Sequence, residues 1–202
     1  MRRDKLASQD EELFSEIMDE VTVGYLGMLL PDGTPRSVGL NFAALGHDIT
    51  FHGALAGEKF ELLQHNPAAG FTVVKEYSYI PSNWSAPCYA CPATQFFKSV
   101  EIRGRCGLVS GPQEKARALQ ALMEKYQPEG GYDKIDASVP QYAKALEMVG
   151  VYRLTTESWT GKIKFGQGEP LKLLRIYVEK LRERNLGMDE ATAVEIENIL
   201  DD

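Results

Sequence analysis

The stretch that decides the fold is Ile49–Pro67, which reads ITFHGALAGEKFELLQHNP. It opens on four residues of strand character, Ile49–His52, and continues through small residues that include Gly53 and Gly57. A helical stretch follows and ends before Pro67, because proline cannot continue a helix. The stretch therefore predicts a strand, a short loop that allows close backbone approach, and a helix.

The order strand, small-residue loop and helix start is one way in which proteins bind an anion. The first helical turn has unpaired N–H donors and a partial positive charge, and Lys59 adds a full charge there. Short glycine loops are common, however, so the same residues also suit an ordinary strand-to-helix connection with a surface lysine. Both interpretations stay open at this point.

The residues before this stretch predict a hairpin. Val21–Leu30 is strand-like, Pro31–Thr34 (PDGT) is a strong turn signal, and Pro35–Ala44 is a second strand. Together with Ile49–His52 they make three antiparallel strands in succession, which favours a barrel or meander over a parallel nucleotide-binding sheet. An amphipathic helix is predicted before them, over Asp10–Glu20.

Apolar periodicity predicts the remaining elements. These are strands at Ala69–Tyr79, Thr94–Ser110 and Val151–Thr155, and helices at Glu58–His65, Pro112–Tyr126, Val139–Val149, Leu171–Arg184 and Asp189–Leu200. The loop Ile80–Pro92 contains three prolines, and loops of this length often serve a site. Aromatic residues in and beside it either wall a pocket for a planar ligand or only pack the loop down; they are Tyr77, Tyr79, Trp84 and Tyr89. The predicted fold class is mainly β with flanking helices, plus a helical C-terminal extension.

Composition indicates one soluble globular domain with an extension. The chain has 202 residues, 44% of them hydrophobic and 25% charged, with a formal net charge of −7. A negative charge argues against nucleic acid or an anionic membrane as the main partner, and no apolar run is long enough to span a bilayer. Residues 1–4 (MRRD) lack the apolar core of a signal peptide, so we expect a cytoplasmic protein.

The cysteines do not predict a disulfide scaffold. There are three, which suits a reducing compartment. Cys88 and Cys91 have the spacing of zinc and thioredoxin-like sites, but no second paired motif supplies two more zinc ligands. Redox-active pairs usually open a helix, whereas this pair lies in a proline-flanked loop. Inert loop cysteines are therefore the favoured interpretation, and no metal site is predicted.

Several motifs resemble a known family when they are taken in order. Besides Ile49–Pro67 they are RSVGLNF (36–42), QFFKSVEIRGRCGLV (95–109), ALQALMEKYQPEG (118–130) and VYRLTTESWTGK (151–162). This series resembles the flavin-binding split β-barrel family that includes pyridoxamine 5′-phosphate oxidase, and within it the Nim-type proteins linked to nitroimidazole resistance. The resemblance covers residues 1–162, predicted to be a flavin-binding domain, and leaves residues 163–202 as the helical extension.

The resemblance implies FMN as cofactor and a homodimer that holds it at the subunit interface. The strand 36–41 then lies along the flavin ring. The positions that the resemblance assigns to the cofactor are Arg36, Ser37, Val38 and Asn41 for the ring, His52, Gly53 and Lys59 for the phosphate, and Lys98 and Ser99, often from the second subunit.

This chain departs from the family pattern at three places. Relatives often have Ser or Thr in place of Gly53 and a basic residue in place of Glu58, whose carboxylate would repel a nearby phosphate. The barrel ends with ESWTGK (157–162) and not with the arginine-bearing motif of pyridoxamine oxidases, so that activity is the weaker hypothesis.

Two functions follow as hypotheses. In the first, the chain is an FMN-dependent oxidoreductase that takes electrons from reduced nicotinamide or another donor and reduces a small planar acceptor such as a nitro compound; no catalytic residue is assigned. In the second, it is a non-catalytic flavin carrier or sensor, or a haem-binding split barrel with His52 as iron ligand.

Overall fold

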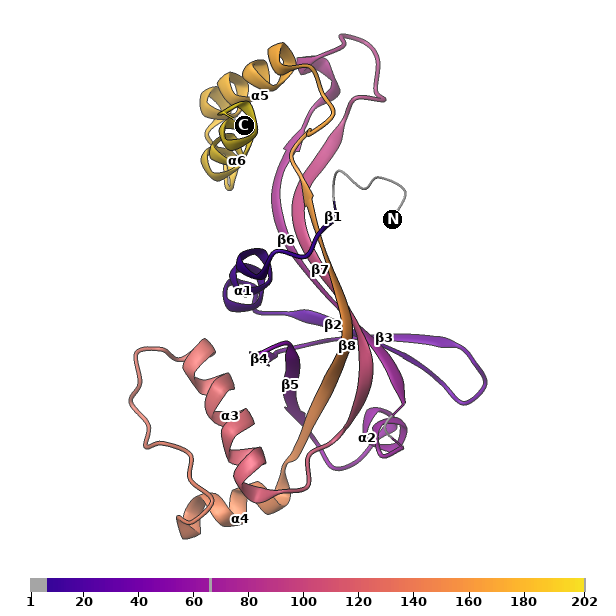
Figure 1. Cartoon of the computed structure of the whole chain (residues 1–202), viewed down its shortest axis with the longest axis vertical. Coiled ribbons are helices and arrows are strands. Elements are labelled where there is room, and N and C mark those ends of the chain that lie inside the picture. Colours follow the sequence, from indigo (N-terminus) through magenta and orange to yellow (C-terminus); the bar gives the residue numbers. More distant parts are fainter. Residues whose placement is uncertain (1–6, 66, 202) are drawn as a thin grey trace. The chain divides into compact units, whose positions relative to one another are not determined.

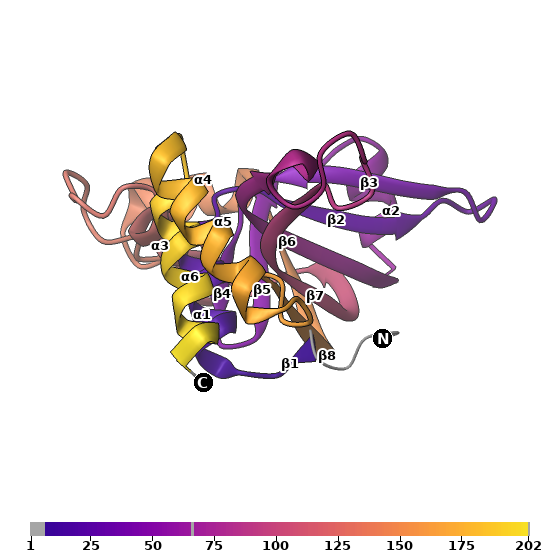
Figure 2. The same ribbon diagram turned by 90° about the horizontal axis from the view of Figure 1, so that it is seen from above.

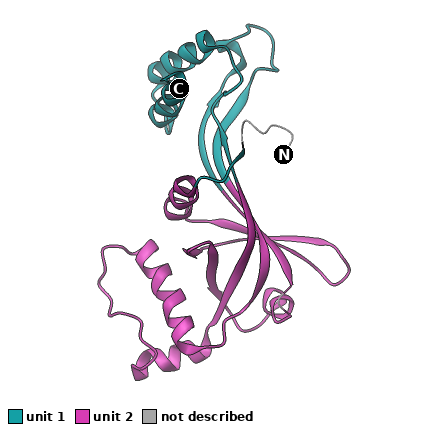
Figure 3. Ribbon diagram, in the orientation of Figure 1, with its two compact units in different colours: residues 1–10, 74–99, 161–202 teal, residues 11–73, 100–160 magenta. Residues whose placement is uncertain are grey.

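The computed structural model describes residues 7–65 and 67–201, so residues 1–6 of the predicted domain, with Asn66 and Asp202, lie outside it. The chain divides into two compact units, coloured in Figure 3. Unit 1 comprises residues up to 10, residues 74–99 and residues from 161; unit 2 comprises residues 11–73 and 100–160. The predicted domain boundary after Lys162 stays a prediction.

The elements follow the predicted order (Figure 1). The strands are β1 (Ala7–Ser8), β2 (Gly24–Leu29), β3 (Pro35–Leu40), β4 (Ala43–Leu45), β5 (Asp48–Gly53), β6 (Ala68–Ile80), β7 (Thr94–Leu108) and β8 (Gly150–Lys164). The helices are α1 (Glu11–Glu20), α2 (Glu58–Leu63), α3 (Pro112–Tyr126), α4 (Pro140–Met148), α5 (Leu171–Arg184) and α6 (Asp189–Asp201), with a short 3-10 turn at Ser82–Trp84.

The strand order in the sheet is β3-β2-β6-β7-β8-β5-β4, and β1 pairs with β8. The registers of β2 with β3 and β6, and of β5 with β4 and β8, are all antiparallel. This sheet with its flanking helices confirms the predicted fold class, including the helical C-terminal extension formed by α5 and α6.

The predicted hairpin is β2 with β3, closed at Pro31–Thr34, where Asp32 Oδ1 accepts a hydrogen bond of 2.9 Å from Thr34 N–H. The prediction of one strand over 35–44 is wrong, because the chain leaves the ladder between β3 and β4. There Asn41 Nδ2 donates to Thr22 O at 3.2 Å and Phe42 N–H donates to Tyr126 Oη at 3.0 Å. These contacts join residues far apart in sequence, so periodicity cannot predict them.

Unit 2 has an apolar core beneath its strands and helices. Buried side chains from β2, β5, β6 and β8 meet there, among them Leu26, Phe51, Phe71 and Tyr152. Helix α1 buries the predicted apolar face, and α3 packs against β4 and β5 (Figure 1). The helix ends are tied together, because Lys125 Nζ of α3 donates to Met18 O of α1 at 2.6 Å.

In unit 1, α5 and α6 lie side by side (Figures 1 and 2). They pack on residues of β6, β7 and β8 through a buried cluster that includes Tyr77, Phe96, Phe165 and Tyr177. The predicted strand 151–155 is too short, because β8 continues to Lys164. Pairing of Ser8 with Gly161 and of Ala7 with Lys162 extends the ladder by a contact distant in sequence. Over residues 7–65 and 67–201, no helix combines the length and the apolar character needed to cross a membrane.

Candidate functional site

The three predicted ring contacts on β3 do not share one face of the sheet. Side chains alternate along a strand, and directly paired residues lie on the same face. Arg36 pairs with Met28 and Val38 with Leu26, whose side chains are buried, while Ser37 pairs with Gly27 on the opposite face. Arg36 and Val38 therefore lie on the core side, and Ser37 does not.

Asn41, the fourth predicted ring contact, lies just after β3. Its side-chain amide already donates to Thr22 O at 3.2 Å, and the residue is exposed. The side chain thus helps hold the break between β3 and β4, and it reaches a cofactor only with its remaining hydrogen-bonding capacity.

The residues predicted to bind the phosphate also fall on two faces of the sheet. On β5, Phe51 pairs with Tyr152 and Gly53 with Gly150, whereas the intervening His52 pairs with Val151 and is exposed. By strand alternation, His52 lies on the opposite face from Phe51 and Gly53. The structure therefore brings Gly53 and Lys59 together and leaves His52 apart from them.

Lys59 folds back over the sheet from the first turn of α2. A Cβ atom built on Gly53 would lie 2.7 Å from Lys59 Nζ, so the glycine leaves room for the ammonium. Lys59 Nζ lies 5.4 Å from the ring centres of both Phe51 and Tyr152, which stack on each other with centroids 5.1 Å apart. The ammonium is thus held by ring faces.

The surroundings of Lys59 disfavour its charge. Burial lowers the pKa of its ammonium below the ordinary 10.5, and the nearby Cys106 acts in the opposite direction. Burial raises the pKa of the Cys106 thiol to about 12, so this thiol is not an anion at neutral pH. Within residues 7–65 and 67–201, the Lys59 ammonium has no carboxylate partner. A partly buried cation in this state is suited to an anionic ligand.

Glu58, the acidic departure from the family pattern, has a partner of its own. Its Oε2 accepts a hydrogen bond from Arg36 Nε at 3.0 Å, and both side chains are about half exposed. The pair joins β3 to the start of α2 and cancels the charge of the carboxylate beside Lys59. Sequence reasoning missed this pair because its members are 22 residues apart.

Lys98 and Ser99 belong to unit 1, whereas the other predicted site residues belong to unit 2. Both are buried, and Lys98 Nζ lies 2.6 Å from Glu195 Oε1 on α6. The extension therefore supplies an internal partner for Lys98. A cofactor phosphate or ring would have to share that ammonium with Glu195.

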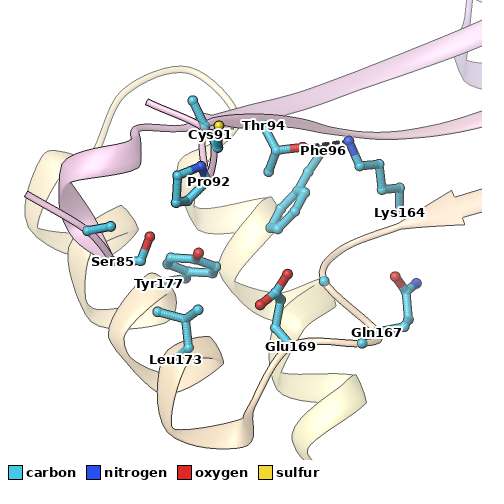
Figure 4. Close-up of a pocket in the computed structure, with 14 residues that line it drawn as sticks. Ser85, Cys91, Pro92, Thr94, Phe96, Lys164, Gln167, Glu169, Leu173 and Tyr177 are labelled. Atoms are coloured by element: carbon cyan, nitrogen blue, oxygen red, sulfur yellow. Dashed lines mark hydrogen bonds between the residues drawn. The ribbon is translucent and has the colours of Figure 1, made fainter. Parts of the chain in front are cut away.

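The loop 80–92 serves a cavity, as the sequence suggested, but through other residues. Ser85, Cys91 and Pro92 line a cavity of about 880 Å³ in unit 1, shown in Figure 4. None of the residues assigned to FMN lines it. Trp84 instead packs on the guanidinium of Arg184, with 4.8 Å between its ring centre and the Cζ atom. The length of the loop was a sequence signal for this cavity, but the aromatic residues proposed as its walls do not line it; these are Tyr77, Tyr79, Trp84 and Tyr89.

The cysteine pair of the loop is exposed and not bonded, while Cys106 is buried. In the described part of the chain, no three His, Cys, Asp or Glu side chains are grouped so that they could hold a metal ion.

The antiparallel sheet and its flanking helices are those of a split β-barrel protein. A family model described as pyridoxamine 5′-phosphate oxidase matches residues 10–163, which is most of the chain. The chain belongs to the pyridoxamine 5′-phosphate oxidase family, and the resemblance inferred from its motifs is confirmed.

Solved structures with the same fold include three from different bacteria. The flavocytochrome Anf3 from Azotobacter vinelandii has a TM-score of 0.67 at 24% identity, covering 81% of this chain and 72% of that one. An FAD and haem binding protein from Mycobacterium smegmatis has a TM-score of 0.64 at 18% identity, covering 78% of this chain and 73% of that one. A candidate 5-nitroimidazole antibiotic resistance protein from Bacteroides thetaiotaomicron has a TM-score of 0.62 at 21% identity, covering 78% of this chain and 86% of that one. At these identities the likeness shows the fold alone. A comparison with curated protein sequences finds no significant match.

Proposed function

We propose that this protein binds FMN and acts as an oxidoreductase on a small planar acceptor such as a nitro compound. Lys59 holds the phosphate beside Gly53, whereas His52, the third residue assigned to the phosphate, lies on the opposite face of β5. Residues 36–41 of β3 and the segment after it lie along the flavin ring. Lys98 and Ser99 complete the assigned set, and we propose that a second copy of the chain supplies them, as in a homodimer.

The observation that carries this proposal is the state of Lys59. Its ammonium is partly desolvated, rests on two aromatic rings and has no carboxylate partner in the described part of the chain. Charge-assisted hydrogen bonds to a phosphate would offset that desolvation. The Arg36–Glu58 pair removes the objection that Glu58 repels the phosphate, because its charge is already balanced.

The backbone of β3 supports the ring placement. β3 stands at the end of the strand order, so one side of its backbone has no strand neighbour within the described sheet. Edge strands present unpaired N–H and C=O groups, and a flavin ring takes such groups as hydrogen-bond partners. The side chains on the two faces of β3 would then lie on either side of the ring, and they would not need to form hydrogen bonds with it.

Bound FMN would supply the redox chemistry, the transfer of electrons from a donor such as reduced nicotinamide to the acceptor. The residues of this chain bind and orient the cofactor and keep the ring beside apolar side chains such as Val38. No side chain of the described residues is assigned as a general acid or base.

The second candidate is a carrier or sensor without turnover, in which flavin or haem is bound. One of the similar structures is named as an FAD and haem binding protein and another as a flavocytochrome, and His52 is an exposed imidazole on β5 that could ligate iron. The visible spectrum of the purified protein separates flavin from haem, and turnover with a nicotinamide donor separates enzyme from carrier.

We expect Lys59→Met to weaken FMN binding by about 1.5–3 kcal/mol, roughly 10- to 150-fold, because a charge-assisted phosphate contact is lost. Riboflavin, which lacks the phosphate, should bind wild type and variant alike. Calorimetric titration of both ligands, and of FAD, measures this. Lys172→Met, on the exposed start of α5, is the matched control and should change neither affinity. An equal loss of affinity for riboflavin and FMN would show that Lys59 does not contact the phosphate.

We expect the chain to sediment as a homodimer when FMN is bound. Exposed apolar residues on β2, Tyr25 and Leu29, leave a surface on the hairpin that a second copy can cover. Analytical ultracentrifugation of the yellow protein measures its mass. A monomer that still binds FMN tightly would contradict the placement of FMN at the subunit interface. It would not contradict the contact between Lys59 and the phosphate.

A further inference from the structure

The cavity in unit 1 has the size of a small-molecule site. Its volume is about 880 Å³, and ligand pockets usually span roughly 300–1,000 Å³. Its walls come from the loop that precedes β7, the first residues of β7, and the segment that leads from β8 into α5 (Figure 4). Because no residue assigned to FMN lines it, the cavity does not depend on the proposed flavin site.

One wall of the cavity is apolar and firmly packed. Phe96 and Tyr177 are buried members of the unit 1 core, with ring centroids 6.3 Å apart, and Leu173 lies one helical turn before Tyr177. Phe96 also packs on Phe165, with ring centroids 5.7 Å apart. A wall built into the core in this way is preformed, so a ligand does not have to organise it.

Glu169 is an exposed residue that lines the cavity beside this wall with an unpaired carboxylate, which has no hydrogen-bond or ion-pair partner within the described residues. Figure 4 shows its carboxylate directed into the space beside the rings of Phe96 and Tyr177. Burial raises the pKa of the Tyr177 hydroxyl, Ser85 lowers it, and the charge of Glu169 raises it, which places the carboxylate within electrostatic reach of that ring.

The other charged group of the cavity is already engaged. Lys164 Nζ donates a hydrogen bond of 2.5 Å to Thr94 Oγ1, drawn as a dashed line in Figure 4. In that view it lies on the other side of Phe96 from Tyr177. The cavity therefore presents a carboxylate beside aromatic faces at one end and a cation–hydroxyl pair at another.

We propose that this cavity binds a small organic amine, whose ammonium pairs with Glu169 and whose apolar body lies on Phe96, Leu173 and Tyr177. A carboxylate forms its strongest hydrogen bonds with a cationic donor, and the faces of aromatic rings attract cations as well. The same carboxylate repels an anionic ligand of equal shape. A hydroxyl or carbonyl at the far end of such an amine would meet the pair formed by Lys164 and Thr94.

The first test is a calorimetric titration of the full chain with 2-phenylethylamine and its neutral analogue 2-phenylethanol. We expect the amine to bind and Glu169→Gln to weaken its binding roughly two- to fivefold, as for an ion pair at an exposed carboxylate, with little change for the alcohol. Glu179→Gln is the matched control, because it removes the same charge from an exposed position of α5 that does not line the cavity. Failure of the amine to bind, or equal effects of the two variants, overturns the proposal.

The second test uses the cysteine pair as an internal reference. Both thiols are exposed, but Cys91 lines the cavity and Cys88 does not. Saturating 2-phenylethylamine should slow iodoacetamide alkylation of Cys91 several-fold more than that of Cys88, as read by mass spectrometry. Ala93→Phe, which fills the cavity and keeps Glu169, should abolish this protection. Equal protection of the two cysteines places the amine elsewhere and overturns the proposal.

Discussion

Asp189→Ala should lower the free energy of unfolding by about 3–5 kcal/mol, the cost of removing one partner from a buried ion pair. The Asp189 carboxylate is 2% exposed and accepts four hydrogen bonds. Two come from the Arg184 guanidinium at 2.5 and 2.8 Å, one from Ser78 Oγ at 2.6 Å, and one from Leu186 N–H at 2.9 Å. The carboxylate therefore joins α5, α6 and β6 within unit 1. Its loss removes the acceptor of Ser78 Oγ and two hydrogen bonds of the guanidinium, which keeps its 2.9 Å bond to Tyr79 O.

Urea unfolding followed by circular dichroism measures this loss, and hydrogen exchange shows whether it falls on α5 and α6. The control is Glu190→Ala, the next residue, whose exposed ion pair with Arg182 should contribute no more than about 1 kcal/mol. An equal loss in both variants would mean that Asp189 contributes only as a surface charge.

The same carboxylate predicts an acid dependence. Arg184 holds the pKa of Asp189 at about 2, below the ordinary 3.8, so folding favours the ionised form. A depressed pKa adds stability that is fully present above pH 3.8 and is lost as the pH falls through about 2. The difference in unfolding free energy between wild type and Asp189→Ala should therefore shrink over that interval. A difference independent of pH would contradict the pairing.

Gly104→Ala should destabilise unit 2 by about 3 kcal/mol, at the upper end of overpacking effects. A Cβ atom on Gly104 of β7 would lie 2.0 Å from the Thr155 carbonyl oxygen of β8 and 2.9 Å from its carbon. These are backbone atoms within the sheet, so no side chain can rotate away, and the two strands would have to separate.

Gly70→Ala is the matched control, because its Cβ would meet only Ile102 O at 3.7 Å, an ordinary contact. We expect Gly70→Ala to unfold at the wild-type midpoint or slightly above it, since alanine lowers the entropy of the unfolded chain. Denaturant midpoints of the two variants, measured in parallel, decide the matter. Equal midpoints would show that β7 and β8 can separate around Gly104 at little cost in free energy.

Local patterns were sufficient for most of the elements of this fold. The PDGT turn, the apolar character of β2 and the helical spacing of apolar residues in α3 each depend on neighbours in sequence, and each was predicted close to its observed position. Periodicity failed where a distant partner decided the outcome. β3 and β4 separate where Asn41 and Phe42 bond Thr22 and Tyr126. β8 continues to Lys164 as a sheet neighbour of β7, and β1 pairs with its residues 161 and 162.

The candidate site divides in the same way. The sequence by itself determined the family, because an ordered set of short motifs carries that information. It also predicted the turn around Gly53 and Lys59 as a phosphate site, which stays a prediction. Only the tertiary structure decided which residues share a face: strand alternation separates Ser37 from Arg36 and His52 from Gly53. It also decided which charges are already paired, since Arg36 binds Glu58 and Lys98 binds Glu195. The sheet face on which a side chain lies depends on strand register, and the partner of a charged group depends on contacts between distant segments. Neither can be read from the spacing of residues along the chain.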